Sequence, residues 1–405
     1  VPRITTPDGL GDVSRVPPAV KGLSLVSLFN DFASEMVYPL LPAFLTGTLG
    51  AGAAVLGALD GAAELTSAIL KWISGRLSDR PGWRKPLILG GYGTAVLIRP
   101  VIAIANAAWQ VIGFRVIDRV GKGLRTAPRD AMLAESTPTA LHGRAFGFHR
   151  AADHLGAMLG SVVAWWAVSQ GMAVRSVIGW SAVPGVVAVL VLAVVLRGAT
   201  RSGGSRVEGV ASQGSRDPQP STLDRGVPLP VALLALLALF RLPEALLLYR
   251  LQQLGVPIAT IPLAWAGLHV VRSTASYPAG RINDAFGSDL LIGAGAALFA
   301  FCLTLLGKPL SAEWAVGVFL LFGLVAALTE PAERALVAKL SPATLGKGFG
   351  VYHALTGAAA LPAGLAFGWI YQASSASDAL WLSAALVGVM GVVWVTTRSR
   401  GAPSL

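Results

Sequence analysis

The stretch Gly75-Arg-Leu-Ser-Asp79-Arg80-Pro-Gly82-Trp-Arg84-Lys85 lies between two long apolar segments and decides the fold. Its glycines and its proline interrupt a helix, so the stretch is expected to form a turn. A second stretch, Gly280-Arg-Ile-Asn-Asp284-Ala-Phe-Gly287, repeats the spacing of glycine, aspartate and glycine 205 positions later (75 to 280), which is half the chain. The sequence therefore predicts two copies of one structural unit, each carrying this turn.

The composition is that of a membrane protein. Of 405 residues, 54% are hydrophobic and 13% are charged, whereas a soluble globular chain carries about 25% charged residues. Apolar runs recur along the chain, and a run of about 20 residues is long enough to cross a bilayer as a helix. Such runs are too long for the strands of a soluble α/β enzyme, which have roughly 4–8 residues. The sequence predicts an all-α membrane protein.

Twelve transmembrane helices are predicted, in two bundles of six. The segment 198–228, rich in Ser, Gly and Arg, separates the bundles and is typical of a flexible linker. The predicted parts are a tail 1–22, a first bundle 23–197, this linker, a second bundle 229–397 and a tail 398–405. The predicted spans are 23–46, 53–74, 86–105, 108–130, 146–169, 175–196, 229–250, 259–279, 288–307, 312–334, 348–371 and 378–397.

The distribution of Arg and Lys predicts the orientation. With both termini inside, the inner segments hold 21 of these residues, including Arg125 and Arg129, and the outer loops hold three, Arg175, Arg250 and Lys308. The positive-inside rule therefore places both termini in the cytoplasm. The net charge of +11 is spread over alternate loops rather than gathered on one soluble face, which argues against nucleic-acid binding. We expect a multi-pass protein of a bacterial inner membrane.

A second internal repeat supports the division into halves. The stretch Gly143-Arg-Ala-Phe-Gly-Phe-His149-Arg150-Ala matches Gly346-Lys-Gly-Phe-Gly-Val-Tyr352-His353-Ala, 203 positions later (143 to 346). Pro128-Arg-Asp130 matches Pro331-Ala-Glu333 at the same distance. Two six-helix halves joined by a polar linker are typical of a secondary transporter built from two repeats.

The motifs resemble those of the major facilitator superfamily, and the resemblance covers essentially the whole chain. The first turn matches the family pattern G-x-L-x-D-R-x-G-x-R-K, with Trp83 in place of a usual basic residue. Arg119-Val-Gly-Lys122-Gly123 resembles the fourth-helix pattern R-x-x-Q-G. Gly156-Ala-Met-Leu-Gly160-Ser161 resembles the antiporter pattern G-x-x-x-G-P, with Ser161 in place of proline. The resemblance implies a monomer whose halves rock about a central site, driven by an ion gradient, with protons as the coupling ion.

Ionisable residues within the apolar spans are candidates for this site, because charges in a bilayer face a partner or a water-filled cavity. The resemblance places the first, fourth, seventh and tenth helices along the central path. The candidates for substrate binding or proton coupling are Asp31, Glu35, Arg119, Lys122, Arg150, Asp153, His154, Arg241, Glu244 and Arg272.

Several pairings are expected among these charges. Asp31 or Glu35 should pair with Arg119, either as a switch broken by a proton or as a permanent ion pair that specifies packing. Arg150, Asp153 and His154 are compatible with a self-satisfied cluster on the fifth helix. Arg272 has no obvious local acid, which makes it a candidate for contact with an anionic substrate. Two further membrane cations, Arg99 and Arg115, should snorkel near the outer ends of their helices.

The two repeated turns are candidates for a cytoplasmic gate. The resemblance implies that Asp79 contacts the start of the eleventh helix, expected near Gly348, and holds the cytoplasmic side closed. A helix N-terminus stabilises a carboxylate in this way. The alternative is an aspartate that only caps its own turn. The proposed gate residues are Gly75, Asp79, Arg80, Gly82, Arg84, Gly280 and Asp284.

Other chemistries lack their motifs. The sequence has no G-x-x-x-x-G-K-[ST] phosphate loop, no H-E-x-x-H and no paired C-x-x-C. We therefore expect neither an enzyme nor a bound cofactor or metal. The leading prediction is proton-coupled export (antiport) of a small organic or amphiphilic solute. The alternatives are import of an anionic solute or metal chelate by symport or uniport, and a sensor or lipid-handling protein with the same fold.

Overall fold

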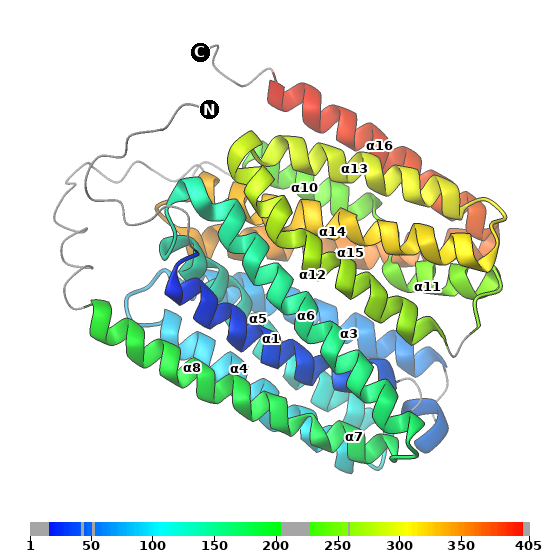
Figure 1. Ribbon diagram of the computed structural model, residues 1–405, viewed down its shortest axis with the longest axis horizontal. Helices are drawn as coiled ribbons and strands as arrows, with labels where there is room; N and C mark the ends of the chain where they lie inside the picture. Colours follow the sequence, from blue (N-terminus) through cyan, green and yellow to red (C-terminus); the bar gives the residue numbers. More distant parts are fainter. Residues whose placement is uncertain (1–15, 42–43, 51–52, 204–226, 258–259, 400–405) are drawn as a thin grey trace.

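The computed structural model describes residues 16–41, 44–50, 53–203, 227–257 and 260–399, and all regular elements within these ranges are helices (Figure 1). Helices of the first part of the chain are α1 (Pro18–Val37), α3 (Ala53–Ser78), α4 (Arg84–Val101), α5 (Ala108–Glu135), α6 (His142–Ser169), α7 (Val174–Trp180) and α8 (Ala182–Gly203). Short turns η1 to η4 (Tyr38–Leu40, Phe44–Thr48, Ile102–Ile104, Thr139–Leu141) connect some of them. The tails and most of the expected linker lie outside the described residues.

Helices of the second part are α10 (Leu229–Phe240), α11 (Glu244–Gln253), α12 (Ile261–Phe286), α13 (Ser288–Leu306), α14 (Ala312–Leu340), α15 (Leu345–Ala373) and α16 (Ala376–Ser399). In Figure 1 the helices of the first part, blue to green, lie below those of the second part, green to red. Each expected span corresponds to one of these helices or to two consecutive ones. The protein is an all-α membrane protein.

Within the described residues, six helical segments are long and apolar enough to cross a membrane: Arg84–Ile104, Val174–Arg197, Ser288–Leu306, Ala312–Leu340, Leu345–Tyr371 and Ala376–Arg398. Others, such as α3 and α5, are as long but contain more charged residues. Their charges are accommodated by contacts inside the bundle, described below.

The seventh expected span, 229–250, is not one continuous helix. It divides into α10 and α11 because Pro243 cannot continue the helix and holds the residue before it out of the helical conformation. Ser383 on α16 supports the break: its hydroxyl accepts a hydrogen bond from the Leu242 amide (3.0 Å) and donates one to the Phe240 carbonyl (2.7 Å). The sixth expected span is similarly divided, into α7 and α8, at Ser181.

Other helix ends also differ from expectation. Helix α1 begins at Pro18, five residues before the expected 23, because proline suits the first turn of a helix. Helix α5 extends past 130 to Glu135, and α14 extends past 334 to Leu340. Arg129, Asp130 and Arg334 therefore lie within these helices rather than at their ends.

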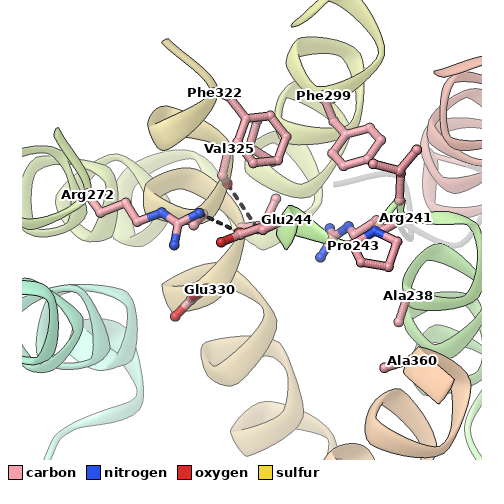
Figure 2. A pocket seen from close by; sticks show the side chains of 13 residues that line it. Ala238, Arg241, Pro243, Glu244, Arg272, Phe299, Phe322, Val325, Glu330 and Ala360 are labelled. Carbon is pink, nitrogen blue, oxygen red and sulfur yellow. Dashed lines mark hydrogen bonds and ion pairs between the residues drawn. The ribbon is translucent and has the colours of Figure 1, made fainter. Parts of the chain in front are cut away.

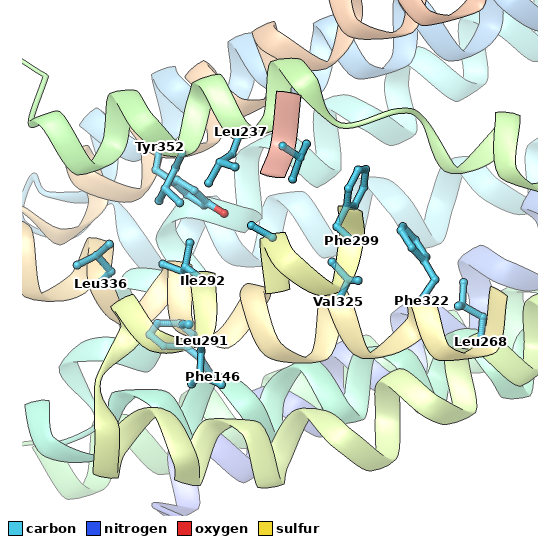
Figure 3. Close-up of a cluster of buried hydrophobic side chains, with 14 of the residues drawn as sticks. Phe146, Leu237, Leu268, Leu291, Ile292, Phe299, Phe322, Val325, Leu336 and Tyr352 are labelled. Atoms are coloured by element: carbon cyan, nitrogen blue, oxygen red, sulfur yellow. The ribbon is translucent and has the colours of Figure 1, made fainter. Parts of the chain in front are cut away.

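The two parts pack closely along two pairs of helices, α6 with α12 and α3 with α15. Glycine makes this approach possible: a Cβ on Gly75 of α3 would lie 2.4 Å from the Gly346 carbonyl oxygen. A Cβ on Gly280 of α12 would lie 2.2 Å from the Gly143 carbonyl oxygen of α6. Aromatic and aliphatic side chains fill the remaining space, among them the cluster in Figure 3, which includes Phe146.

One end of the bundle gathers the repeated turns. It comprises residues 76–85, 135–144, 281–288 and 339–347, and we refer to it as the basic end. Arg84 of the first turn forms an ion pair with Glu135 at the end of α5. Both close helix pairs, α3–α15 and α6–α12, meet there, so the two parts of the chain are in direct contact at this end.

Candidate functional site

A cavity of about 320 Å³ lies beside the break between α10 and α11 (Figure 2). Arg241, Pro243 and Glu244 come from the break itself, and Arg272 comes from α12. The other lining residues come from α10, the break, α13, α14 and α15: Ala238, Leu242, Phe299, Phe322, Val325, Ala326, Thr329, Glu330 and Ala360. The cavity therefore combines two guanidinium groups, two carboxylates and an aromatic wall.

Arg272 forms an ion pair with Glu244, contrary to the expectation that it has no acid nearby (Figure 2). The Arg272 side chain is 6% exposed and the Glu244 side chain is 37% exposed. The helix break explains the pairing, because Glu244 begins α11, where a carboxylate is also favoured by the helix N-terminus. Of this pair, the carboxylate is therefore the partner that reaches the open space.

Arg241 pairs with Glu333 of α14 at 3.2 Å, not with its sequence neighbour Glu244. The Tyr352 hydroxyl donates to the other oxygen of Glu333 at 2.6 Å. The two residues are three positions apart, a spacing that would suit a pair on one helix, but Arg241 lies outside both helical segments. The sequence analysis did not include Glu333 or Tyr352 among the site residues, although both stand in the internal repeats.

Arg150 connects the two parts of the chain. Its guanidinium lies 2.9 Å from Asp153, as expected on one helix, and also 3.4 Å from Glu330 of α14. Glu330 lies 3.6 Å from Arg334 as well. The cluster on the fifth helix is therefore not self-contained, and it reaches the cavity wall through Glu330.

His154 does not join the Arg150–Asp153 pair. Its Nδ1 lies 3.3 Å from Nδ1 of His269 on α12, and the Trp265 ring packs edge-on against His269. Both imidazoles are buried, and neither Nε2 has a hydrogen-bond partner in the described part of the chain. The expected cluster thus divides between two contacts to the second half.

The expected pairing of Arg119 with Asp31 or Glu35 is wrong. Arg119 lies 3.9 Å from both Glu64 and Asp118. The Asp31 carboxylate accepts a hydrogen bond from the side-chain amide of Asn30 at 2.8 Å. Glu35 has one buried oxygen, Oε2, that finds no hydrogen-bond partner among the described residues. Helix α1 faces α6 and α8 more than α5, which explains why similar depth did not produce the pair.

Lys122 lies in the same region of the first half. It interacts electrostatically with Glu64 and Asp31, and with the neighbouring cations Arg119 and Lys71. The Glu64 side chain is 53% exposed. This region therefore carries charges of both signs.

Arg99 and Arg115 do not snorkel at helix ends, as expected, but are buried together around Asp118. Their guanidinium groups lie 2.8 and 3.1 Å from its two oxygens. Arg99 also donates to the Asn30 carbonyl at 2.8 Å. Asp118 was missed in the sequence, although its position three residues after Arg115 on one helix was a visible signal.

Asp130 is a second buried carboxylate that the sequence analysis left out of the site. It is fully buried and accepts hydrogen bonds from Arg129 and from His353 Nε2, the latter at 2.9 Å. Arg334 lies 3.7 Å away. Arg125 and Arg129, expected in a cytoplasmic loop, are buried inside the bundle. The match of Asp130 with Glu333 in the internal repeat was the available signal.

At the basic end, two aspartates receive hydrogen bonds from helix N-termini of the opposite half. Asp79 accepts from the amides of Gly346 (2.8 Å) and Lys347 (2.7 Å) at the start of α15. Asp284 accepts from the amides of Gly143 (2.7 Å) and Arg144 (3.0 Å) at the start of α6. The contact lies two residues before the expected Gly348, and it has a counterpart in each half.

The neighbours of Asp79 shape this contact. Burial raises the pKa of Asp79, and the two backbone donors and Arg84 partly oppose that rise. Arg84 lies 3.6 Å from Asp79. Gly82 adopts a φ of 80°, a conformation that favours glycine, which explains its place in the turn. Arg80 is exposed to solvent.

No cluster of three or more His, Cys, Asp or Glu side chains that could hold a metal ion occurs among the residues that the structure describes. The arrangement offers groups that can bind a solute: paired charges, aromatic walls and inter-half contacts. It can hold a solute of mixed polarity and can change when a proton or a solute displaces an ion-pair partner.

Comparisons with known proteins find similar chains. The family profile described as Major Facilitator Superfamily matches residues 23–268. An uncharacterised MFS-type transporter of Methanocaldococcus jannaschii is 27% identical over 360 residues, covering 87% of this chain and 88% of that protein. The multidrug resistance protein MdtH of Cronobacter sakazakii is 25% identical over 398 residues, covering 91% and 92%.

Two solved structures have a similar fold. The proton:xylose symporter XylE, bound to 6-bromo-6-deoxy-D-glucose, has a TM-score of 0.73 at 16% identity and covers 95% of both chains. The human organic anion transporter MFSD10 has a TM-score of 0.69 at 17% identity, covering 95% of this chain and 100% of that one.

Proposed function

Because this chain belongs to the major facilitator superfamily, we propose that it moves a small organic or amphiphilic solute by alternating access, with proton-coupled export as the leading mode. The cavity beside the α10–α11 break carries this proposal. Helices broken at bilayer depth are where secondary transporters bind their substrates. Here the break presents Arg241 and Glu244 to open space, opposite an aromatic wall.

The lining suits a solute with an apolar body and at least one charge. Phe299 and Phe322 provide the apolar wall. Glu244 is more exposed than its partner Arg272, so a cationic group can approach the carboxylate without first displacing the arginine. The relation to a multidrug resistance protein supports an amphiphilic solute.

We propose that the basic end is cytoplasmic and that the Asp79 and Asp284 contacts form its gate. The positive-inside rule supports this orientation. Both aspartates bind helix N-termini of the opposite half. Separating the halves at this end must therefore break four hydrogen bonds from backbone amides to the two carboxylates. The geometry fits a state in which access from the basic end is closed.

Proton coupling is proposed for Asp31 and Glu35 on α1. Glu35 has an oxygen without a hydrogen-bond partner in the described residues, so this oxygen can accept a proton without breaking a hydrogen bond. A proton on Glu35 would alter its electrostatic interaction with Arg119 and Lys122. This proposed coupling does not depend on breaking a single ion pair, because Arg119 and Lys122 also interact with Glu64.

The alternative is import of an anionic solute by symport or uniport. Arg241 supports it, since its guanidinium lines the cavity. The fold similarity to an organic anion transporter and to a proton symporter is compatible with this mode, but similarity at this level shows the fold alone.

The test is proton flux in vesicles that contain the purified protein, with pools of compounds supplied on either side. We expect a cationic amphiphile to drive proton movement in the opposite direction, and Glu244→Gln to weaken its apparent affinity. A double variant, Asp31→Asn with Glu35→Gln, should still bind the compound but move no protons.

The matched control is Asp289→Asn, whose partner Arg398 lies away from the cavity on α16. It should leave flux and affinity unchanged. Solute movement that is equal in the native protein and the double variant, and independent of pH, would rule out the coupling role of α1. An anionic solute moving with protons would favour the importer.

A further inference from the structure

Another cavity, of about 370 Å³, lies at the basic end between α3 and α15. Its lining residues are Trp72, Arg76, Val227, Lys347, Val351, Ala354 and Leu355. Among the described residues it shares no lining residue with the cavity at the α10–α11 break. Its walls come from both halves of the protein, so it lies on the seam between them.

The chemistry of this cavity is divided between a cationic edge and an apolar floor. The Arg76 guanidinium stacks over the Trp72 ring, 3.9 Å from the ring centroid, and Lys347 contributes a second positive charge. Val351, Ala354 and Leu355 form the floor along α15. Trp72 is 39% exposed, so the cavity has access from outside.

This division corresponds to the two parts of a phospholipid. Basic pockets between transmembrane helices on the cytoplasmic side bind anionic headgroups, and tryptophan is favoured at the headgroup level of a membrane. An acyl chain can lie along the apolar floor while its phosphate approaches the two cations. The helical residues that line the cavity lie in the last turns of α3 and the first turns of α15, which matches the headgroup level of a membrane.

The internal repeat shows why the cavity is open on this side. Trp72 and Val351 correspond by the two repeat distances, 205 and 203, to Tyr277 and Phe148. Tyr277 and Phe148 pack edge to face, with ring centroids 6.0 Å apart, between α6 and α12. Val351 is too small to make the same contact with Trp72. The seam between α3 and α15 therefore lacks the ring that fills the equivalent place.

We propose that this cavity binds an anionic phospholipid of the leaflet at the basic end, with its phosphate at Arg76 and Lys347 and one acyl chain along α15. The site is separate from the solute path. It is also adjacent to the gate, since the Lys347 amide donates to Asp79. A bound lipid joins the two halves and favours the closed basic end.

The test measures lipids that stay with the protein. Purified protein from nanodiscs of phosphatidylglycerol and phosphatidylcholine is analysed by native mass spectrometry. We expect preferential retention of phosphatidylglycerol, reduced about fivefold by Arg76→Gln, as suits the loss of one cation near a lipid surface. Val351→Phe, which copies the aromatic filling of the other half and keeps both charges, should reduce retention as strongly.

The control is Arg281→Gln, because Arg281 is the exposed equivalent of Arg76 in the second half. It should retain the lipid as the native protein does. Glycerol 3-phosphate, which lacks acyl chains, should fail to displace the lipid. Equal retention of both lipids, retention unchanged in Arg76→Gln and Val351→Phe, or displacement by glycerol 3-phosphate would each overturn the proposal.

Discussion

At the scale of single residues, several buried charges find partners on other helices that spacing along one helix does not indicate. Asp118 receives Arg99 from α4, Glu333 receives Arg241 from the helix break, and Asp130 receives His353 from α15. Sequence spacing predicted which residues are ionisable and inside the membrane, but not these partners. The pairing depends on which helices are neighbours and on how their ends are bent, and neither is visible within one span.

Asp118 should matter most for stability. Asp118→Asn leaves two buried guanidinium groups without their counter-charge, and breaking a buried pair costs about 3–5 kcal/mol. We expect a lower thermal unfolding temperature in detergent, measured by loss of helical signal. The control is Asp289→Asn, because the Asp289–Arg398 pair is partly exposed and such pairs contribute about 0–1 kcal/mol. Equal unfolding temperatures for the two variants would contradict this role.

At the scale of helices, the two inter-half contacts depend on glycine. Gly75 and Gly350 bring the backbones of α3 and α15 together at the basic end, as Gly143 and Gly280 do for α6 and α12. The repeated glycines were visible in the sequence, whereas their packing against the opposite half was not. The break before α11 was less visible, because prolines also occur within continuous helices here, as in α4 and α14.

Gly75→Ala should separate the halves at the basic end. Its Cβ would lie 2.4 Å from a carbonyl oxygen and 2.6 Å from Gly350 Cα, both backbone atoms that must move. Spin labels at Trp83 and Pro342, in a variant whose Cys302 is replaced by serine, report the distance across the basic end. We expect a longer and broader distance distribution than in the native protein.

The control for this substitution is Gly90→Ala, because Gly90 is also helical and has no atom within 4 Å of an added Cβ. It should leave the distribution unchanged. If Gly75→Ala gave the native distribution while the protein stayed folded, the close approach of α3 and α15 would not maintain the closed basic end.

At the scale of the whole molecule, the internal repeat extends from the sequence to the gate. Two motifs half a chain apart predicted two equivalent halves, and both aspartates contact the opposite half in the same way. The two halves differ at one pair of equivalent positions, where the second half has Val351 and the first has Phe148. The importance of this difference became clear only from the packing of Phe148. The sequence thus predicted the architecture, and the family resemblance the contact of Asp79 with α15, better than the charge pairs.

The two gate contacts should contribute similarly. Asp79→Ala or Asp284→Ala leaves two backbone amides without their acceptor, and a hydrogen bond to a charged group contributes about 1.5–3 kcal/mol. We expect each variant to raise the rate at which a thiol reagent modifies a cysteine placed at the closed basic end, at least tenfold. The matched control is Asp378→Ala, at the start of α16 and outside both contacts.

A variant that carries both Asp79→Ala and Asp284→Ala tests whether the two contacts act independently. If the aspartates act on the same closure, the double variant should open further than either single one. A variant of Asp284 that behaves like the Asp378 control would show that the second repeat keeps the contact without a role in closure.

The charge content of α5 has a consequence for how the protein is made. The helix does not reach the hydropathy of a self-sufficient span, and its carboxylate Asp118 pairs with Arg99 of the preceding helix. During synthesis, α4 leaves the ribosome before α5, so Arg99 emerges before its partner Asp118. Its burial becomes favourable only when Asp118 follows. We therefore expect the two helices to insert together, with the Arg99–Asp118 pair forming once α5 has followed α4.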